Sequence, residues 1–441
     1  RTTPLYGEFD VVVLGGGPAG IAAAACAARN GARTLLVERY GFLGGMGTAA
    51  GVTNFCGLHA NVHGEIRQVV HGIADDLLDR MRALDGLNEP HLVLGKIHAQ
   101  AYDMSAFKCA ADALLLDAGV QLLFHALGAG VAKHGDGRLD ALLLETKSGR
   151  VAVRSHLFID CSGDADLAHW AGVPTEKGDA QGQLLYPTLM FRVGNVNAER
   201  AGEAWRSIPQ LMDEAEASGD FHFPRRGAIV RPQRHAYEWR VNVTQMKNAD
   251  GSATDGTDAR ALSAGEAEGR RQIVDYLRFL RERVPGFERA YALDIAPQLG
   301  IRETRRLVGE AMLSGDDVLG CASFADSIGV NGWPLEQHVA GDVRWGWPPI
   351  PESRGYNQLP LRMVLPRLAT AGGASNLLVA GRCASMTHEG QSAARVSGAC
   401  FVMGQAAGTA AALALRRSVT PHALPAGELQ AGLTAPGAFL G

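Results

Sequence analysis

The residues best suited to chemistry in this sequence are three glycines that follow a short apolar stretch. Gly15, Gly17 and Gly20 form the pattern G-x-G-x-x-G, and Glu38 stands eighteen residues after the last of them. In such a turn the first glycine permits a sharp bend, the second lets the backbone approach a pyrophosphate, and the third lets helix and strand pack closely. An acid about 20 residues further on binds ribose hydroxyls. The spacing predicts a site for an ADP-containing dinucleotide and does not distinguish NAD from FAD.

The elements that would position these glycines follow one another in the order that a βαβ unit requires. An apolar strand over 9–14 precedes the turn, an alanine-rich helix over 21–30 follows it, and a second strand over 34–37 ends at Glu38. The free N–H groups and the dipole at the helix N-terminus favour phosphates. Another apolar strand, over 376–381, ends in glycine far along the chain. We therefore expect a dinucleotide domain that a second domain interrupts.

The segment between these two parts differs in character. Alternating stretches over 120–159 predict a β-meander that leads to a second strand-to-glycine turn. Residues 184–351 carry most of the tryptophans. The Trp- and Pro-rich pattern over 332–356 predicts a long loop of the kind that covers a binding site. We predict an α/β protein with a discontinuous Rossmann-like domain (parallel sheet plus β-meander) over 1–183 and 352–441. The inserted part would be an α+β substrate domain with a lid loop.

The composition is that of an ordinary soluble globular protein of two or three domains, with 441 residues, 46% apolar and 20% charged. A net charge of -4 without a basic block argues against a nucleic-acid partner. The longest apolar stretch, 393–415, is interrupted by Arg395, Gln405 and glycines, so we expect a buried helix and no membrane span. The seven cysteines form no C-x-x-C pair, which argues against a metal cage and suits a reducing, cytoplasmic location.

Longer motifs surround these turns. They include DVVVLGGGPAG, RYGFLGGMGT, FIDCSGDADLA, WPLEQH, and YNQLPLRMVLP followed by NLLVAGRCASMTHEG. Through them the sequence resembles flavoproteins with the two-dinucleotide fold of the glutathione-reductase type. More narrowly, it resembles the FAD-dependent oxidoreductase family, relatives of the fumarate reductase flavoproteins. The resemblance implies FAD as the cofactor, held without a covalent link and from both ends of the chain.

The resemblance also implies which residues hold the cofactor. These positions are Gly15, Gly17, Pro18, Ala19, Gly20, Glu38, Arg39, Gly44, Gly45, Met46, Gly163, Asp164, Gly381 and Arg382. The first glycine turn and Glu38 would hold the ADP half, and Gly163 and Asp164 would lie near the adenine. Arg382 stands where many relatives have an acid that binds a ribitol hydroxyl, and we expect it to contact the diphosphate. Cys56 raises the question of a covalent flavin link, which its spacing does not require.

Because a flavin supplies the hydride chemistry, the protein must orient the substrate and move a proton. His338 and His388 lie in motifs of the family, and a histidine of near-neutral pKa can take a proton from a C–OH or C–NH group. The alternative for each is a structural or surface histidine. Arg302 and Arg362 are candidates to clamp a carboxylate or to stabilise an anionic reduced flavin. A structural ion-pair network is the alternative for the other charges of the IRETRR run.

These residues predict an enzyme, a dehydrogenase or oxidase, that transfers a hydride between FAD and an alcohol or amine carbon of a small polar substrate. Reduction of an activated alkene, as in fumarate reductases, is one alternative. We place it second because its arginine proton donor matches no pattern in this sequence. The other alternative is an electron-transfer flavoprotein subunit of a larger complex. The expected partners are a small-molecule substrate, an electron acceptor (oxygen or another carrier) and further copies of the chain in a homo-oligomer.

Overall fold

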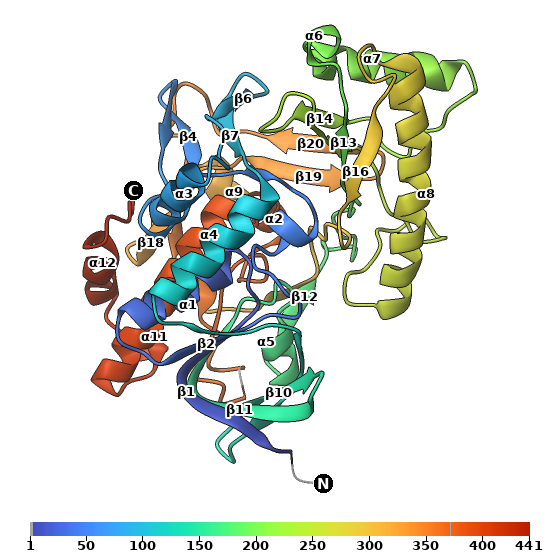
Figure 1. Ribbon diagram of the computed structural model, residues 1–441. Helices are drawn as coiled ribbons and strands as arrows, with labels where there is room; N and C mark the ends of the chain where they lie inside the picture. The colour runs from blue at the N-terminus through green and yellow to red at the C-terminus, as the bar shows by residue number, and fades with distance from the viewer. Residues whose placement is uncertain (1–2, 371) are drawn as a thin grey trace.

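The main sheet contains the predicted dinucleotide-binding strands. The computed structural model describes residues 3–370 and 372–441 (Figure 1). In sheet order, the strands are β8 (Gln121–Leu123), β2 (Thr34–Val37), β1 (Leu5–Leu14), β11 (Gly149–Asp160), β10 (Leu139–Thr146) and β9 (Ala126–Lys133), with β22 (Leu377–Val379) also paired to β11. Strands β8, β2, β1, β11 and β22 run parallel, whereas β9, β10 and β11 form an antiparallel meander. The predicted α/β class, with a parallel sheet plus a β-meander, is confirmed.

Strand β11 joins the meander to the parallel sheet. Its twelve residues pair with β10 over the first half, and Phe158 to Asp160 pair with β22. The last strand of the expected meander and the strand that leads to the second glycine turn are therefore one continuous strand. Because β22 comes from the far end of the chain, the sheet is assembled from two distant segments, as predicted.

Four helices pack into one hydrophobic core with one face of this sheet. They are α1 (Pro18–Arg29), α3 (Ile73–Ala83), α4 (Met104–Asp117) and α11 (Ser397–Arg417). Helices α1 and α11 cross with their backbones in contact, since a Cβ on Gly404 would lie 2.1 Å from the Ala19 carbonyl oxygen. Gly408 meets Ala23 in the same way, at 2.1 Å. The small residues of these two helices therefore permit the close crossing.

Helix α11 corresponds to the long apolar stretch of the sequence. It is the one helix in 3–370 and 372–441 that is long and apolar enough to cross a membrane. The protein itself buries 89% of its most apolar window, as it would for a core helix. The helix packs on α1 in the middle of the fold, between the sheet and the C-terminal helix α12 (Ala426–Thr434) (Figure 1).

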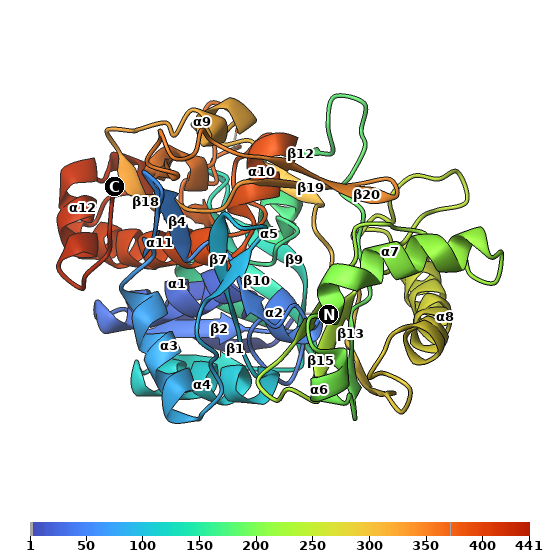
Figure 2. The ribbon, with the colours of Figure 1, turned by 90° about the horizontal axis from the view of Figure 1, so that it is seen from above.

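A second layer has its own antiparallel sheet and its own core. Its strands, in order, are β14 (Ile229–Pro232), β15 (Trp239–Asn242), β13 (Phe191–Gly194) and β16 (Tyr291–Ile295). Its helices are α6 (Ala198–Ala201), α7 (Ala204–Ala217) and α8 (Ala259–Arg283). The apolar residues of this layer, from Leu189 to Ile301, form a separate hydrophobic cluster. Figures 1 and 2 show α7 and α8 on the far side of this layer from the main sheet.

The chain leaves and re-enters the main body at neighbouring points. Strand β12 (Thr175–Lys177) pairs with β17 (Arg305–Leu307), and Thr188 bridges to Gly300. Residues after this junction, such as Val330, belong to the core of the first layer. We propose that the inserted part ends near 301 and not at 351, because its separate core ends there.

The predicted lid loop over 332–356 contains a β-hairpin, so its description as a loop is wrong in part. Strands β19 (Leu335–Val339) and β20 (Asp342–Gly346) pair around a turn at Gly341. The hairpin touches the second layer, where the Gly341 amide donates to Gln245 Oε1 at 2.8 Å. Both faces of β19 are largely buried, so the sequence lacks the apolar–polar alternation that would have revealed a strand.

Short elements complete the fold. They are α2 (Met46–Ala49), β3 (Asn54–Phe55), β4 (His59–Val62), β5 (Glu65–Gln68), β6 (His91–Val93), β7 (Ile97–Ala101), α5 (Asp166–Trp170), α9 (Gly315–Leu319), β18 (Ser327–Asn331), β21 (Asn357–Pro360) and α10 (His388–Ala394), with 3-10 turns at Leu361–Val364 and Pro421–Ala423. Of these, α2, β3 and the start of α5 border the cavity described next.

Candidate active site

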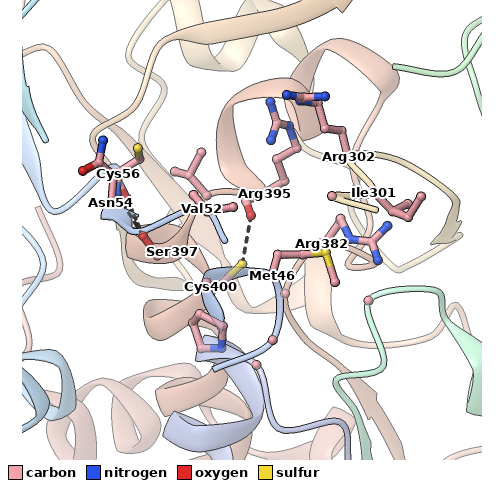
Figure 3. A pocket seen from close by; sticks show the side chains of 18 of the residues that line it. Met46, Val52, Asn54, Cys56, Ile301, Arg302, Arg382, Arg395, Ser397 and Cys400 are labelled. Atoms are coloured by element: carbon pink, nitrogen blue, oxygen red, sulfur yellow. Dashed lines mark hydrogen bonds between the residues drawn. The ribbon is translucent and has the colours of Figure 1, made fainter. Parts of the chain in front are cut away.

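A cavity of about 510 Å³ lies between the main sheet and the second layer. At one end it is lined by the turn after β1 and the first residues of α1, and at the other by β15 and the β19–β20 hairpin. Figure 3 shows side chains from separate segments, among them Met46, Arg382, Arg302 and Arg395, along its wall. Its volume lies within the range of about 300–1,000 Å³ that is usual for ligand sites.

The three glycines of the first turn have three different surroundings. Gly15 has a φ of +100°, and a Cβ there would lie 2.4 Å from the Cys161 carbonyl oxygen. A Cβ on Gly20 would lie 1.8 Å from the Gly15 carbonyl oxygen. Gly17 differs, because a Cβ there would meet no protein atom nearer than Gly45 Cα at 3.6 Å. The protein fold itself requires Gly15 and Gly20, whereas a Cβ on Gly17 would make only an ordinary van der Waals contact, which leaves room for a ligand to approach the backbone.

The N-terminus of α1 begins at Gly17, and no side chain of the helix itself caps it. Gly17 is the N-cap residue and provides no side-chain cap, and the first turn contains no acidic residue. Unpaired N–H groups at a helix N-terminus, together with the helix dipole, bind phosphate groups. This end of the cavity is therefore suited to the diphosphate of a dinucleotide.

Glu38 is held in place at the end of β2 and lines the cavity. Its Oε2 accepts a hydrogen bond from the Gly16 amide at 2.7 Å, and its Oε1 accepts one from the Tyr40 amide at 3.0 Å. The side chain is 6% exposed. A carboxylate fixed beside a phosphate-binding turn is the group that binds ribose hydroxyls. Its neighbour Arg39 also lines the cavity and donates to Gln298 Oε1 at 2.8 Å.

The second glycine loop packs directly on the first. The Gly44 amide donates to the Gly16 carbonyl oxygen at 2.8 Å, and a Cβ on Gly45 would lie 2.7 Å from Gly17 Cα. Both glycines have positive φ, and Met46 begins α2 immediately afterwards. The loop therefore extends the cavity wall from the phosphate-binding turn towards β3.

The turns after β11 and β22 meet because these strands are paired. Arg382 Nη2 donates to Asp164 Oδ1 at 3.0 Å, and its Nη1 lies 3.3 Å from the Thr304 hydroxyl. Gly163, Gly381 and Arg382 line the cavity, whereas Asp164 lies behind Arg382. The ion pair holds the guanidinium in position at the wall of the cavity. A contact from Arg382 to a diphosphate stays a prediction.

The cavity brings most of the predicted cofactor residues together. Those that line it are Gly15, Gly17, Pro18, Ala19, Glu38, Arg39, Gly45, Met46, Gly163, Gly381 and Arg382. Gly20, Gly44 and Asp164 support these residues from behind. Three features fit the ADP half of FAD: the room beside Gly17, the uncapped N-terminus of α1 and the fixed carboxylate of Glu38.

His338 lies at the opposite end of the cavity on β19 and is 2% exposed. Its Nε2 lies 3.1 Å from Glu336 Oε1, and Trp333 Nε1 donates to Glu336 Oε2 at 2.9 Å. Since Nε2 faces a carboxylate, the Nε2-protonated tautomer is favoured, which leaves Nδ1 as a proton acceptor. Nδ1 is buried and has no hydrogen-bond partner within 3–370 and 372–441. This geometry is that of a base oriented by a carboxylate.

Burial and nearby charges together set the protonation state of His338. Burial, followed by the charge of Arg302, holds the pKa of His338 well below its usual value, and Glu336 opposes this shift. Burial would raise the pKa of Glu336, but the hydrogen bond with His338, the charge of Arg395 and the hydrogen bond with Trp333 hold it below its usual range. At neutral pH the pair is therefore a neutral imidazole beside an ionised carboxylate.

The other two candidate catalytic residues lie outside the cavity. His388 begins α10 with its Nδ1 2.9 Å from Glu303 Oε2, and Glu303 also pairs with Arg306 deep in the protein. Arg362 is on the surface, where its Nε lies 3.0 Å from Asp326 Oδ2. Of the four residues proposed for catalysis, the structure brings only His338 and Arg302 to the cavity.

Several cavity residues were not singled out from the sequence. Glu336 and Arg240 lie on strands, and Arg395 lies just after α10. Glu336 and His338 are two residues apart, a spacing that places both on one face of a strand, so recognition of β19 would have revealed the pair. Arg240 and Arg395 have no local pattern, because they meet only through the fold.

Comparison with known proteins adds the family to this geometry. The model of a family described as FAD dependent oxidoreductase matches residues 10–433. The chain belongs to this family. FAD is its cofactor, and the protein is an FAD-dependent oxidoreductase enzyme. The resemblance inferred from the motifs is thereby confirmed.

The curated relatives match this FAD-dependent oxidoreductase over part of their length. The digeranylgeranylglycerophospholipid reductase of Thermoplasma volcanium is 26% identical over 204 residues, which are 43% of this chain and 48% of the relative. The dihydrolipoyl dehydrogenase of Trypanosoma brucei brucei is 51% identical over 45 residues, 10% of this chain and 9% of the relative. The chain thus spans about half of the first relative and a small part of the second.

Two solved structures are similar over nearly the whole chain. A geranylgeranyl bacteriochlorophyll reductase-like protein from Thermoplasma acidophilum is 15% identical and covers 96% of this chain and 82% of its own, with a TM-score of 0.47. The p-nitrophenol 4-monooxygenase of Pseudomonas putida is 11% identical and covers 94% and 82%, with a TM-score of 0.49. Neither likeness bears on the substrate of this oxidoreductase.

Proposed function

We propose that this oxidoreductase removes a hydride from an alcohol or amine carbon of a small polar substrate and that FAD, held without a covalent link, accepts it. His338 receives the accompanying proton at Nδ1. The observation that carries this proposal is a cavity-lining imidazole with a buried, unpartnered Nδ1 and with its Nε2 facing Glu336. Hydride removal from a C–OH or C–NH group needs a base of this kind.

The cavity combines cofactor-binding residues with candidate catalytic residues, which supports this proposal. Bound FAD supplies the redox chemistry, so the protein has to bind, orient and move one proton. The α1 turn and Glu38 would hold the ADP half at one end, while His338 and Arg302 stand at the other end. A substrate between them would be enclosed by the hairpin and by β15, which keeps bulk water from the reacting carbon.

The low pKa of His338 makes it a weak base when no anionic ligand occupies the cavity. Its neighbour Arg302 contributes to this low value, and its partner Glu336 opposes it. A substrate that offsets the charge of Arg302 would raise the pKa of His338 towards the working range of a general base. In this proposal substrate binding itself activates the base.

Reduction of an activated alkene is the second candidate, because of Arg302. Burial, with the charges of Arg225 and Arg395, lowers the pKa of Arg302 well below its usual value. A guanidinium with a lowered pKa donates a proton more readily than an ordinary arginine does. The name of the Thermoplasma volcanium relative, a reductase, points the same way. The two candidates differ in direction and use the same cavity.

Anaerobic reduction of the holoprotein tests the proposal and separates the alternatives. Purified protein with bound FAD is mixed with a panel of small alcohols and amines while flavin absorbance is followed. We expect at least one substrate to bleach the flavin, and His338→Gln to slow bleaching by about 10²–10⁴-fold with FAD retained. Reoxidation of dithionite-reduced protein by activated alkenes alone would favour the second candidate. Reduction only by a protein partner would overturn both and favour an electron-transfer subunit.

A further inference from the structure

The cavity end that holds His338 is unusually rich in arginine. Four arginines line it, namely Arg231, Arg240, Arg302 and Arg395, and Arg225 lies behind them, 1% exposed. Arg302 and Arg240 are 6% and 4% exposed. Figure 3 shows Arg302 and Arg395 at the same end of the cavity. Burying cationic groups is costly unless they are paired with opposite charge, so their partners decide what this end is for.

Among the residues that the structure describes, Arg302 has only neutral hydrogen-bond partners. Its Nη1 donates to the Tyr186 carbonyl oxygen at 2.5 Å, and its Nη2 lies 3.5 Å from Asn242 Oδ1. The same amide oxygen already accepts from Arg225 Nη1 at 2.8 Å. Two buried guanidinium groups thus converge on one neutral acceptor. Arg225 Nε and Nη2 have no partner in the part of the chain that the structure describes.

Arg240 and Arg395 are similarly short of acceptors. Arg240 Nη1 donates to the Val52 carbonyl oxygen, and its Nη2 can pair with the Asn54 amide oxygen at 3.0 Å. Arg395 Nη2 lies 3.2 Å from the Glu336 carbonyl oxygen and 3.9 Å from its carboxylate. The Nε atoms of both arginines are buried without a partner among residues 3–370 and 372–441.

Acidic groups at this end do not balance the arginines. Glu336 is the buried carboxylate there, and His338 and Trp333 already occupy its two oxygens. Asp342 lies on the exposed rim of the cavity. Burial lowers the pKa of Arg240 and of Arg395, and the charge of Glu336 opposes this shift in both. The described residues leave at least one full positive charge without a counter-charge.

An apolar wall adjoins the arginines. Trp333 and Trp345 both line the cavity, with ring centroids 6.2 Å apart, and Trp333 is 4% exposed. Val52 and Phe55 line it as well. Such a wall favours an aromatic or apolar ligand body over a bare inorganic ion.

We propose that the substrate of this oxidoreductase is an organic anion, with an oxyanion group on Arg240 and Arg302 and an apolar, preferably aromatic, body against Trp333 and Trp345. The proposal rests on the proposed function for the identity of the reaction but not for the binding itself. Guanidinium groups bind carboxylate and phosphate oxygens through paired N–H donors. The anion supplies the charge that the arginines lack. It also offsets the effect of Arg302 on the neighbouring His338.

The FAD diphosphate is the other anion to consider as a partner for these arginines. The features suited to phosphate, Gly17 and the uncapped N-terminus of α1, belong to the turn after β1 in the main sheet. Arg240 lies instead on β15 of the second layer, with its guanidinium against Val52 and Asn54. If the arginines hold the substrate, their replacement weakens anion binding and leaves FAD in place.

Ligand titrations of the holoprotein test the proposal without turnover. The probes are benzoate, its neutral analogue benzamide, acetate and inorganic phosphate. Binding is followed by calorimetry and by the change in flavin absorbance. We expect benzoate to bind at least about tenfold more tightly than acetate or phosphate, and benzamide to bind at least about tenfold more weakly than benzoate. Equal binding of benzoate and benzamide, or no binding of any anion, would overturn the proposal. Phosphate binding as tight as benzoate would overturn the aromatic body.

Variants connect the binding to the named residues. Arg240→Gln and Arg302→Gln should each weaken benzoate by about tenfold or more while the FAD content is unchanged. The matched control is Arg344→Gln, at an exposed arginine on β20 of the β19–β20 hairpin, and it should bind as the wild type does. Arg240→Lys and Arg302→Lys keep the charge and guard against a folding defect, so they should recover part of the affinity. Loss of FAD in the folded arginine variants, or unchanged benzoate affinity, would contradict the assignment.

The two proposals fail in different ways. A holoprotein that binds benzoate through Arg240 and Arg302, yet is reduced by no alcohol or amine, refutes the reaction and keeps the anion site. A holoprotein that is reduced by neutral alcohols and ignores every anion refutes the anion site and keeps the reaction.

Discussion

His338 Nε2 lies 3.1 Å from Glu336 Oε1, and both side chains project from the same strand into the cavity of this oxidoreductase. The carboxylate fixes the ring so that the opposite nitrogen, Nδ1, is the one left for a substrate proton. Burial keeps the ring neutral, and the carboxylate remains ionised. The pair therefore combines a proton acceptor with the group that orients it.

Glu336 is a positioning residue, and replacing it should change the base without removing it. Glu336→Gln keeps a hydrogen-bonding group of the same size but loses the charge that favours the Nε2–H tautomer. We expect kcat to fall by about 10²-fold or more, with FAD still bound. The pH profile of kcat is the decisive readout, because Glu336→Gln should shift its acidic limb to lower pH. An unchanged profile would mean that Glu336 has only a structural role.

The ion pair between Glu303 and Arg306 should matter for stability. Both side chains are almost fully buried, and Glu303 also accepts from the Leu185 amide at 2.9 Å and lies beside His388. Glu303→Gln leaves Arg306 without its counter-charge and should lower the free energy of unfolding by about 3–5 kcal/mol. Chemical denaturation measures this loss.

His388 provides the contrast with His338. Since it contacts Glu303 and does not line the cavity, His388→Ala should reduce stability by about 1–3 kcal/mol and leave kcat close to the wild-type value. A large fall in kcat for folded His388→Ala would restore it as a catalytic candidate.

The glycines of the first turn should respond differently to substitution. A Cβ on Gly17 makes only an ordinary van der Waals contact, 3.6 Å from Gly45 Cα, so Gly17→Val should yield a folded protein that has lost its yellow colour. A Cβ on Gly20 would collide with the Gly15 carbonyl oxygen, so Gly20→Ala should destabilise the fold itself. Circular dichroism and the flavin-to-protein absorbance ratio distinguish the two outcomes. Normal FAD content in Gly17→Val would refute the assignment of this turn to the cofactor.

Acid should destabilise the protein through His59. Burial, with the nearby charges of His98 and His71, lowers the pKa of His59 from 6.5 to about 4. The unfolded chain therefore binds a proton below about pH 6.5, and the folded protein binds it only near pH 4. The free energy of unfolding should fall between these values by at most about 3 kcal/mol from this residue. His59→Gln should reduce the slope in urea titrations at pH 7, 6 and 5, and an unchanged slope would contradict this account.

The sequence was sufficient for features that are local. The turn from Gly15 to Gly20 and the acid at Glu38 predict one end of the cavity, because strand, turn and helix follow in sequence order. The strand over 376–381 indicated that the sheet is closed by a distant segment, and β22 confirms it.

The other end of the cavity could not be predicted in this way. Glu336 and His338 share a strand whose two faces are both buried, so its pattern resembled that of a loop. Arg240 and Arg395 come from different layers and line the same cavity only because the fold brings their segments together. His388 resembled a catalytic residue by its motif, yet the fold turns it towards Glu303. Reaction chemistry here depends on contacts between distant segments, which leave no periodic signal.

The most direct test of the central claim is the rate of anaerobic flavin reduction at several pH values, with the substrate found by the alcohol and amine panel. The wild-type rate should fall as the pH drops through the pKa that His338 has with substrate bound. His338→Gln should bind FAD fully and reduce it about 10²–10⁴-fold more slowly, with no acidic limb in its profile. Wild-type rates and an unchanged pH profile in His338→Gln would contradict the claim that this histidine takes the proton.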